Sequence, residues 1–252
     1  MPWNPEKYHL FQSQRSAPFD DLLELVDIRP GLRVVDLGCG TGELTRRLAD
    51  SLPGSDVLGL DSSPQMLERA GEHVRPGLRF ERGNQAELGG EWDLIYSNAA
   101  LQWSENHEQL VPRLFNRLAA GGQIAVQMPS NHNSTAHLTI IEVARREPFA
   151  SALGGWTRQS PVLSIEAYAE MLFREEAQEI LVFEKVYPHV LENADAIVDW
   201  ISGTALVPYF ERLDSLKDDF VSAIRQDLRV LMPGEPVFYP FRRTFFSARK
   251  SA

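Results

Sequence analysis

The chain has 252 residues, of which 43% are hydrophobic and 24% are charged, and its formal net charge is −10. This composition is that of a globular protein and excludes a disordered or fibrous chain. The acidic balance argues against nucleic acid or an anionic membrane surface as the main partner, because both require a basic face on the protein. A single cysteine excludes an intramolecular disulfide, and six scattered histidines form no metal-ligand pattern, so we expect no metal site.

The N-terminus has no apolar segment of the kind found in signal peptides, since residues 1–7 read Met-Pro-Trp-Asn-Pro-Glu-Lys. No apolar run approaches the roughly 18 residues that a membrane span requires. We therefore expect a cytoplasmic protein whose partner is a small molecule. The oligomeric state stays open.

Strand-like and helix-like runs alternate along the first half of the chain. The first helix follows Ser16 as a candidate N-cap and has Pro18 in its first turn. A later helix opens within residues 62–65 with a serine cap, a first-turn proline and a candidate capping box, and another is capped by Asn106. The predicted helices cover residues 17–28, 43–52, 62–74 and 107–118, and the predicted strands cover residues 33–37, 56–61, 78–82, 93–98 and 123–128.

This alternation predicts right-handed βαβ units and therefore an α/β fold with a parallel sheet. Such sheets bind ligands beyond the carboxyl ends of their strands. After Pro129 the rhythm changes, and we expect the later helices to cap the ligand-binding edge. The later helices are predicted at residues 135–146, 164–173, 193–204 and 214–231, and the later strands at residues 178–187 and 237–249.

A glycine-rich loop follows the first predicted strand. Residues 34–42 read Val-Val-Asp-Leu-Gly-Cys-Gly-Thr-Gly. Glycines at alternate positions allow backbone angles forbidden to other residues and let a ligand approach the main chain closely. The pyridine-nucleotide fingerprint G-x-G-x-x-G is the nearest alternative, but here the third glycine comes one residue early. Asp36 would also repel a pyrophosphate, and it suits a ligand with a positive charge.

A second acid, Asp61, ends the second predicted strand, 19 residues past Gly42 (61 − 42 = 19). Whether or not the glycine loop binds a pyridine nucleotide, a carboxylate at this place accepts hydrogen bonds from both hydroxyls of a ribose. Asp61 therefore predicts a ribose site beside the loop.

In their order along the chain, Asp36, the loop glycines and Asp61 resemble the motifs of the class I S-adenosylmethionine methyltransferases. The resemblance implies a Rossmann-like, mostly parallel seven-stranded sheet with flanking helices, extra helices that cap the cofactor and substrate edge, and S-adenosyl-L-methionine as cofactor. It puts Asn84 where the family usually carries an acid for the adenine amino group; the amide oxygen can accept the same hydrogen bond. The cofactor-binding residues that the resemblance implies are Asp36, Gly38, Cys39, Gly40, Gly42, Asp61, Ser62, Met66, Gly83, Asn84, Gln85 and Asn98.

Three further segments are similar to those of the trans-aconitate methyltransferases. Residues 3–18 read Trp-Asn-Pro-x-x-Tyr-x-x-Phe-x-x-x-Arg-x-x-Pro, residues 97–107 read Ser-Asn-Ala-x-Leu-Gln-Trp-x-x-x-His, and residues 125–129 read Ala-Val-Gln-Met-Pro. This resemblance covers essentially the whole chain. It implies methylation of a carboxylate of a small di- or tricarboxylic acid to a monomethyl ester, with trans-aconitate as the first candidate. Val207 departs from the family, which carries an arginine there.

We expect one methyltransferase domain over residues 1–252. Residues 1–30 would form an N-terminal lid, in which Tyr8, Phe11 and Arg15 share a helical face. Residues 131–175 and 190–232 would form substrate-capping insertions.

A carboxylate acceptor determines what the site needs. It is already ionised at neutral pH, so methyl transfer requires no general base, and we expect no catalytic residue in that sense. The enzyme must instead align the reactants, which is worth roughly 7–11 kcal/mol, and hold the acid with cations such as arginine. The candidate substrate-binding residues are Tyr8, Arg15, Trp103, Gln127, His132, Arg158, Tyr239, Arg242 and Arg243.

Other functions stay open at this point. Methylation of an oxygen or nitrogen of another small metabolite would need a base, for which His132 and His137 are candidates. A non-catalytic cofactor-binding protein would have its acceptor cavity filled by side chains. A pyridine-nucleotide enzyme is disfavoured by Asp36 and by the glycine spacing.

Overall fold

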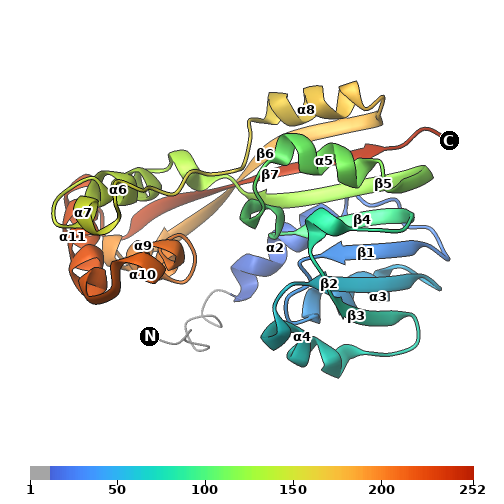
Figure 1. Cartoon of the computed structure of the whole chain (residues 1–252), viewed down its shortest axis with the longest axis horizontal. Coiled ribbons are helices and arrows are strands. Elements are labelled where there is room, and N and C mark those ends of the chain that lie inside the picture. The colour runs from blue at the N-terminus through green and yellow to red at the C-terminus, as the bar shows by residue number, and fades with distance from the viewer. Residues whose placement is uncertain (1–11) are drawn as a thin grey trace. The chain divides into compact units, whose positions relative to one another are not determined.

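The structure is a computed structural model that describes the backbone of residues 12–252 and the side chains from residue 17 onward. Its elements are shown in Figure 1. The chain divides into two compact units, which we describe separately. Unit 1 contains Ser130–Ser160 and Val186–Arg242. Unit 2 contains the described residues up to Pro129, then Pro161–Lys185 and Arg243–Ala252.

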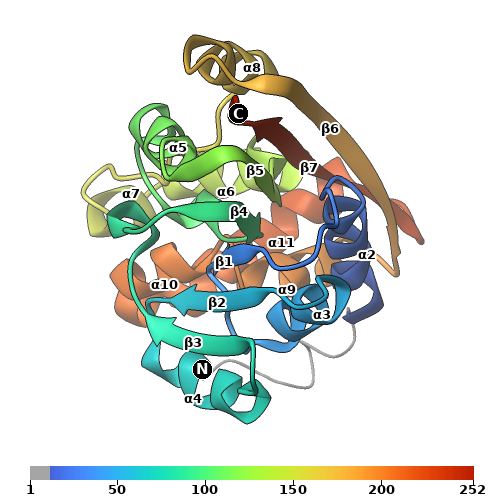
Figure 2. The same ribbon diagram turned by 90° about the vertical axis from the view of Figure 1, so that its right-hand side faces the viewer.

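A seven-stranded sheet with the order β3-β2-β1-β4-β5-β7-β6 forms the framework of unit 2, although residues 186–191 of the sixth strand and residues 237–242 of the seventh belong to unit 1. The first five strands pair in parallel, and β7 runs antiparallel to β5. Figure 2 shows β3, β2, β1, β4 and β5 side by side. The mostly parallel, Rossmann-like sheet predicted above is therefore confirmed. The strands are β1 (Arg33–Leu37), β2 (Asp56–Asp61), β3 (Leu78–Arg82), β4 (Trp92–Asn98), β5 (Leu118–Pro129), β6 (Gln178–Leu191) and β7 (Val237–Arg249).

The helices fall into two sets. Those of unit 2 are α2 (Gln12–Leu23), α3 (Glu43–Ser51), α4 (Pro64–Ala70), η1 (Gly71–His73), η2 (Gln85–Glu87), η3 (Leu101–Trp103), α5 (His107–Phe115) and α8 (Ile165–Arg174). Those of unit 1 are η4 (Asn131–Asn133), α6 (Thr135–Ala144), α7 (Phe149–Ala152), α9 (Ala194–Ser202), α10 (Val207–Leu213), η5 (Asp214–Leu216) and α11 (Lys217–Leu231).

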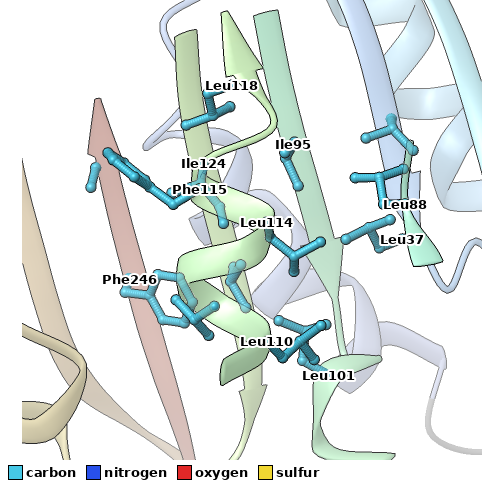
Figure 3. Close-up of a cluster of buried hydrophobic side chains, with 14 of the residues drawn as sticks. Leu37, Leu88, Ile95, Leu101, Leu110, Leu114, Phe115, Leu118, Ile124 and Phe246 are labelled. Atoms are coloured by element: carbon cyan, nitrogen blue, oxygen red, sulfur yellow. The ribbon is translucent and has the colours of Figure 1, made fainter. Parts of the chain in front are cut away.

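One face of the sheet packs against α5 and α8. Alternate residues of a strand point to opposite faces, so Val35 and Leu37 of β1 lie on the same face and join one buried cluster with Ile95 of β4. Leu110 and Leu114, one helical turn apart on α5, pack on this face, as Figure 3 shows. Each such buried leucine contributes about 1.5–3 kcal/mol relative to an exposed one, so this face is a main source of stability.

Helix α2 packs against β4 and β5. Phe19 and Leu22 are 1% and 0% exposed, and the Phe19 ring meets the ring of Tyr96 edge-on, with the centroids 5.9 Å apart. Beyond the helix, the backbone N–H of Asp27 donates to Gln123 Oε1 at 3.0 Å. The segment from Phe19 to Asp27 therefore packs on the sheet and does not act as a lid. For the residues before Phe19, the lid predicted over residues 1–30 stays a prediction.

Unit 1 has its own helical core. Helix α11 packs against α6 and α9. Its residues Phe220, Ile224 and Leu228 are each 0% exposed and recur every four residues, which places them along one side of the helix. The predicted insertion over residues 131–175 does not stay together: its part up to Ser160 lies in unit 1, and the rest, with α8, lies in unit 2.

Several predicted boundaries were wrong. The first helix covers Gln12–Leu23 rather than residues 17–28, so Ser16 is not its N-cap and Pro18 lies inside it. The helix after Asn106 ends at Phe115, because the chain already enters β5 at Leu118. Asn106 occupies the N-cap position, but its side chain makes no capping bond.

Other local predictions fared differently. Ser63, with its hydroxyl accepting from the backbone N–H of Met66, caps α4, so the capping box that would start at Ser62 does not form. Helices α7 and α10 were not predicted. The last strand has the predicted bounds, Val237–Arg249. Within the described residues, no helix has both the length and the apolar character needed to cross a membrane.

Candidate functional site

The carboxyl ends of the parallel strands bring the predicted cofactor residues of unit 2 together. The register aligns Leu37 of β1 with Leu60 of β2, and Asn98 of β4 with Gln127 of β5. Strand order reverses between β1 and β4, since β2 and β3 lie on one side of β1 and β4 and β5 on the other. Open α/β sheets bind their ligands outside the strand ends at such a reversal. The glycine loop leaves β1 at this point.

The backbone N–H groups of the glycine loop are used within the protein. Gly38 and Cys39 both donate to one carbonyl of β2, at 2.7 and 3.1 Å. Gly40 donates to Asp61 Oδ2 at 2.9 Å, and Gly42 donates to the carbonyl of Cys39 at 3.0 Å. A dinucleotide loop instead turns such groups toward a pyrophosphate. The bonding pattern therefore disfavours the pyridine-nucleotide alternative.

Two loop glycines have different surroundings. Gly38 has φ 73°, and a Cβ atom added there would lie 2.2 Å from the Cβ of Ala100. Gly40 has φ 56°, but an added Cβ would meet no atom within 4 Å. Gly38 thus allows close packing inside the fold, whereas the space beside Gly40 is open to a ligand.

Asp61 is fixed by two loops. Its Oδ2 accepts from the backbone N–H of Gly40, and its Oδ1 accepts from the backbone N–H of Ser63 at 2.8 Å. A carboxylate oxygen can accept two hydrogen bonds, so each oxygen keeps a place for a further donor. The side chain is half-buried. Its geometry therefore fits a pair of ribose hydroxyls.

Asp36 is a buried carboxylate at the end of β1, only 4% exposed. Thr45 of α3 donates its hydroxyl to Asp36 Oδ2 at 2.6 Å. Burial raises the pKa of Asp36 to about 6, the Thr45 bond opposes that rise, and the charge of Asp61 adds to it. Near neutral pH this group is mostly an anion in a poorly solvated place, where a cationic ligand group would be stabilised.

A chain of hydrogen bonds joins the carboxyl ends of β4 and β5 to the middle of β7 within unit 2. Arg243 donates to Gln127 Oε1 at 3.0 Å, and Gln127 Nε2 donates to Asn98 Oδ1 at 2.6 Å. Gln127 is 0% exposed and Arg243 is 7% exposed. Gln127 thus fixes the two side chains beside it through its amide oxygen and nitrogen, and its predicted role as a direct substrate donor stays a prediction.

Two buried side chains, His107 and Tyr168, fix the turn η3 that follows Asn98. His107 Nε2 lies 2.8 Å from the carbonyl of Leu101, and His107 Nδ1 lies 2.5 Å from the hydroxyl of Tyr168 on α8. Trp103, the last residue of this turn, is 52% exposed. Ordinary core packing is thereby excluded for Trp103, which stays available as a wall of the methyl-transfer site.

In unit 1, four predicted substrate residues lie around the start of α6 or on β7. His132 and Arg158 both act electrostatically on the ring of His137. The backbone N–H of Arg242 donates to Asn131 Oδ1 at 2.7 Å. Tyr239 is 1% exposed. Of the remaining two candidates, Tyr8 lies outside the described residues, and Arg15 lies in α2 with a side chain outside them.

Comparison with known proteins gives the family. Residues 34–122 match the family model of a methyltransferase domain. The chain is 48% identical over 257 aligned residues to a trans-aconitate 2-methyltransferase of Deinococcus radiodurans, with 99% of each chain covered. It is 38% identical to a trans-aconitate 2-methyltransferase of Paracidovorax citrulli, again over 99% of each chain.

The chain belongs to the trans-aconitate 2-methyltransferase family. It is therefore an S-adenosylmethionine-dependent methyltransferase, as the glycine loop and the two acids predicted. Solved structures agree in fold. The YcgJ protein from Bacillus subtilis superposes with a TM-score of 0.63 at 14% identity, covering 94% of this chain and 99% of that one. A Haemonchus contortus phosphoethanolamine N-methyltransferase 2, in complex with phosphomonomethylethanolamine and S-adenosylhomocysteine, has a TM-score of 0.58 at 20% identity, covering 96% and 53%.

Several predicted cofactor residues of this methyltransferase have other tasks in the structure. Burial raises the pKa of the Cys39 thiol, and the residue is only 8% exposed, so its side chain is not available to a ligand. Asn84 Oδ1 accepts from the backbone N–H of Ala86 at 2.9 Å, which leaves one acceptor position for an adenine amino group. Gln85 donates to the hydroxyl of Ser104.

The other predicted cofactor residues follow β2 and β3. Ser62 is exposed and Met66 is 37% exposed, as expected of side chains available to a ligand. Gly83 follows β3, and a Cβ added there would lie 2.6 Å from Leu60 Cδ1, so the glycine meets a packing requirement.

Sequence reasoning missed the residues that position the site. Thr45 binds Asp36 from nine residues away, and Tyr168 reaches His107 across 61 residues, so neither contact has a local signal. Ser134 could have been found, because a serine before a helical run is typical of an N-cap, and Ser134 does cap α6.

Proposed function

We propose that this methyltransferase transfers the methyl group of S-adenosylmethionine to a carboxylate of a small polycarboxylic acid, with trans-aconitate as the first candidate, and forms a monomethyl ester. The proposal rests on the full-length likeness to trans-aconitate 2-methyltransferases, at 48% identity over 99% of both chains. A cytoplasmic location is part of the proposal, and a single, buried cysteine fits it.

The residues around the glycine loop fit the cofactor. Asp61 offers two acceptor positions for the ribose hydroxyls, and the open space beside Gly40 admits the ligand to the main chain. Asp36 supplies negative charge for the cationic methionine end. Ser62, Met66, Gly83, Asn84 and Asn98 complete the proposed cofactor set. When bound, the cofactor supplies an electrophilic methyl group.

The protein's own residues then have a limited chemical task. A carboxylate acceptor is already ionised at neutral pH, so no side chain has to remove a proton. His137 would be a poor base in any case, because burial together with the charges of His132 and Arg158 lowers its pKa to about 4. What remains is to orient the acid and to exclude water, which favours rigid, buried donors.

Cations and donors for the acid are available in each unit. In unit 2, Arg243 is held by Gln127, and Trp103 presents an apolar surface. In unit 1, the candidates are His132, Arg158, Tyr239 and Arg242. The proposed contribution of Tyr8 and Arg15, which would close over the acid from the N-terminal segment, concerns side chains outside the described residues.

A methyl-transfer screen tests the proposal. The purified chain is incubated with radiolabelled S-adenosylmethionine and a panel of acids: trans-aconitate, cis-aconitate, citrate, isocitrate and the monocarboxylate crotonate. We expect label in a base-labile ester with trans-aconitate or a closely related tricarboxylate, and much less with crotonate. Labelling of none of the acids by a chain that binds S-adenosylhomocysteine would contradict the acceptor class and leave the cofactor assignment intact.

A further inference from the structure

A set of hydrogen-bond donors surrounds the start of α6 in unit 1. The turn η4 leads into this helix, and the backbone N–H of Ser134 donates to the carbonyl of Asn131 at 2.8 Å. The same turn is tied to β7, since Asn131 Oδ1 accepts from Arg242 N, and Ser130 N donates to Arg242 O at 3.0 Å. Asn131 and Ser134 are therefore held in place by main-chain bonds on two sides.

Two buried donors of this region have no hydrogen-bond partner among the described residues. They are Nδ2 of Asn131, a residue that is 3% exposed, and the hydroxyl of Tyr239, which is 1% exposed. Burial raises the pKa of Tyr239 to about 12, and the nearby hydroxyl of Ser134 opposes that rise. Buried polar groups in native proteins are almost always paired, so two unpaired donors beside one turn indicate a ligand.

The Ser134 and His137 side chains supply a third donor. Ser134 Oγ lies 2.9 Å from His137 Nδ1, and it also accepts the capping bond from the backbone N–H of His137. With a pKa of about 4, the ring is neutral at physiological pH. A hydroxyl and a neutral imidazole have two polar hydrogens between them, and their mutual bond uses one. Whichever tautomer is present, one hydrogen remains for a ligand.

The electrostatic environment of these donors is positive. His132 and Arg158 both lower the pKa of His137, and no carboxylate of the described residues acts on the pKa of either His137 or Tyr239. Donors without acceptors, next to a guanidinium, are the surroundings that an anion requires. A neutral or cationic ligand would leave those donors without a strong acceptor.

We propose that Asn131, Ser134, His137 and Tyr239, the donor cluster, bind a carboxylate of the acid substrate that is not itself methylated. This inference rests on the proposed function and adds to it a specificity element. A carboxylate has four acceptor positions on two oxygens. The two hydrogens of the Asn131 amide, the hydroxyl hydrogen of Tyr239 and the remaining hydrogen of the serine–histidine pair can fill them. The donor cluster would thereby select acids that carry at least one carboxylate besides the one that accepts the methyl group.

Two nearly isosteric variants test the donor cluster. Tyr239→Phe removes the unpaired hydroxyl, and Asn131→Asp keeps the acceptor for Arg242 N while it replaces the free donor by a negatively charged oxygen. We expect each variant to raise the KM for trans-aconitate at least tenfold and to leave the affinity for S-adenosylhomocysteine within threefold of wild type. The preference for trans-aconitate over crotonate should fall by a similar factor, which a merely structural role would not produce.

The matched control is Tyr96→Phe in unit 2. The Tyr96 hydroxyl donates to the carbonyl of Phe19 at 3.4 Å, so its removal should lower the melting temperature and leave the KM for trans-aconitate unchanged. Tyr239→Phe should show the opposite pattern, because it removes a hydroxyl for which the described part of the chain offers no hydrogen-bond partner. Unchanged KM and acid preference in Tyr239→Phe and Asn131→Asp, with a wild type that methylates trans-aconitate, would overturn the inference and leave the proposed function standing.

A direct binding measurement distinguishes failure of the donor cluster proposal from failure of the proposed function. If the wild type methylates no acid, the proposed function fails, and calorimetry with trans-aconitate on the complex with S-adenosylhomocysteine then decides on the donor cluster. Binding by the wild type that weakens at least tenfold in Tyr239→Phe supports a carboxylate site. Absence of binding, or equal binding by the variant, overturns it.

Discussion

The carboxylate of Asp61 has the clearest task of any single side chain. It accepts one hydrogen bond from the glycine loop and one from the start of α4, and it still has room for two more. A group fixed in this way needs no rearrangement when a ribose arrives, which lowers the entropy cost of binding. Asp61 is thus both a support of the loop and the proposed ribose acceptor.

Replacing Asp61 by alanine should weaken cofactor binding at least tenfold. Two charge-assisted hydrogen bonds to the ribose are lost, each worth roughly 1.5–3 kcal/mol. Calorimetry with S-adenosylhomocysteine measures the effect. Asp56→Ala, at the opposite end of the same strand, is the control, because Asp56 pairs with Arg79 on the exposed surface. Equal affinities of Asp61→Ala and wild type would show that the ribose lies elsewhere.

The raised pKa of Asp36 leads to a prediction about how the stability of the protein depends on pH. Its pKa is about 6 in the folded protein against an ordinary 3.8, so the native state holds this proton more tightly than the unfolded state. The contribution of Asp36 to stability therefore falls as pH rises from about 4 to about 6, and above that range the buried charge is destabilising. Asp36→Asn, which cannot ionise, should be more stable than wild type at pH 8, and the difference should vanish near pH 4.

Urea unfolding at both pH values measures this difference, with the exposed Asp218→Asn as control. Asp36→Asn should also bind S-adenosylmethionine more weakly than wild type, since it lacks the negative charge that is proposed to face the cationic methionine end of the cofactor. A stability difference of the same size at pH 4 and pH 8 would mean that Asp36 does not carry the shifted pKa.

At the scale of elements, the glycine loop combines two requirements that substitutions can separate. Gly40→Ala puts a methyl group into open space at φ 56°, which costs about 1–2 kcal/mol of backbone strain. It should fold, but bind S-adenosylhomocysteine at least tenfold more weakly, because the methyl group occupies the ligand's approach. Gly38→Ala adds a 2.2 Å clash with Ala100 to the same strain, and should lose more stability.

Chemical denaturation and calorimetry together distinguish the two glycine variants. Gly71→Ala is the control, since Gly71 has helical angles and open surroundings, and it should be neutral or slightly stabilising. Greater stability of Gly38→Ala than of Gly40→Ala would contradict the assignment of Gly38 to packing.

The elements that could be predicted are those with strong local signals. The strand before the glycine loop and the final strand have the predicted bounds, since apolar runs bounded by glycine, proline or charged residues identify strands. Helix α2 was misplaced because it contains Pro18 and lacks a clear apolar stripe at its start, so local rules began it too late. The contacts of Thr45 with Asp36 and of Tyr168 with His107 depend on how distant segments pack, which no local pattern encodes.

At the scale of the whole molecule, the proposed tasks follow the division into two units. The acids and glycines proposed for the cofactor lie in unit 2, at the ends of parallel strands. The donor cluster lies in unit 1, at the start of α6. Unit 2, which contains the matched methyltransferase domain, is thus proposed to bind the cofactor, and unit 1 contains the features proposed to select the acid.

The pH dependence of the reaction tests whether the methyl acceptor is a carboxylate. The rate of the chemical step, measured in single turnover, should stay nearly flat from about pH 6.5 to about pH 9, because an acceptor carboxylate is ionised throughout that range. Two of the protein's own shifted groups lie outside this range, since the pKa of His137 is about 4 and that of Tyr239 is about 12, and Asp36, with a pKa of about 6, is mostly ionised from about pH 7 upward. A tenfold rise in rate per pH unit within this window would mean that the acceptor must lose a proton first. That result would favour methylation of a hydroxyl or an amine over a carboxylate, and it would require a base that the buried, weakly basic ring of His137 is unsuited to provide.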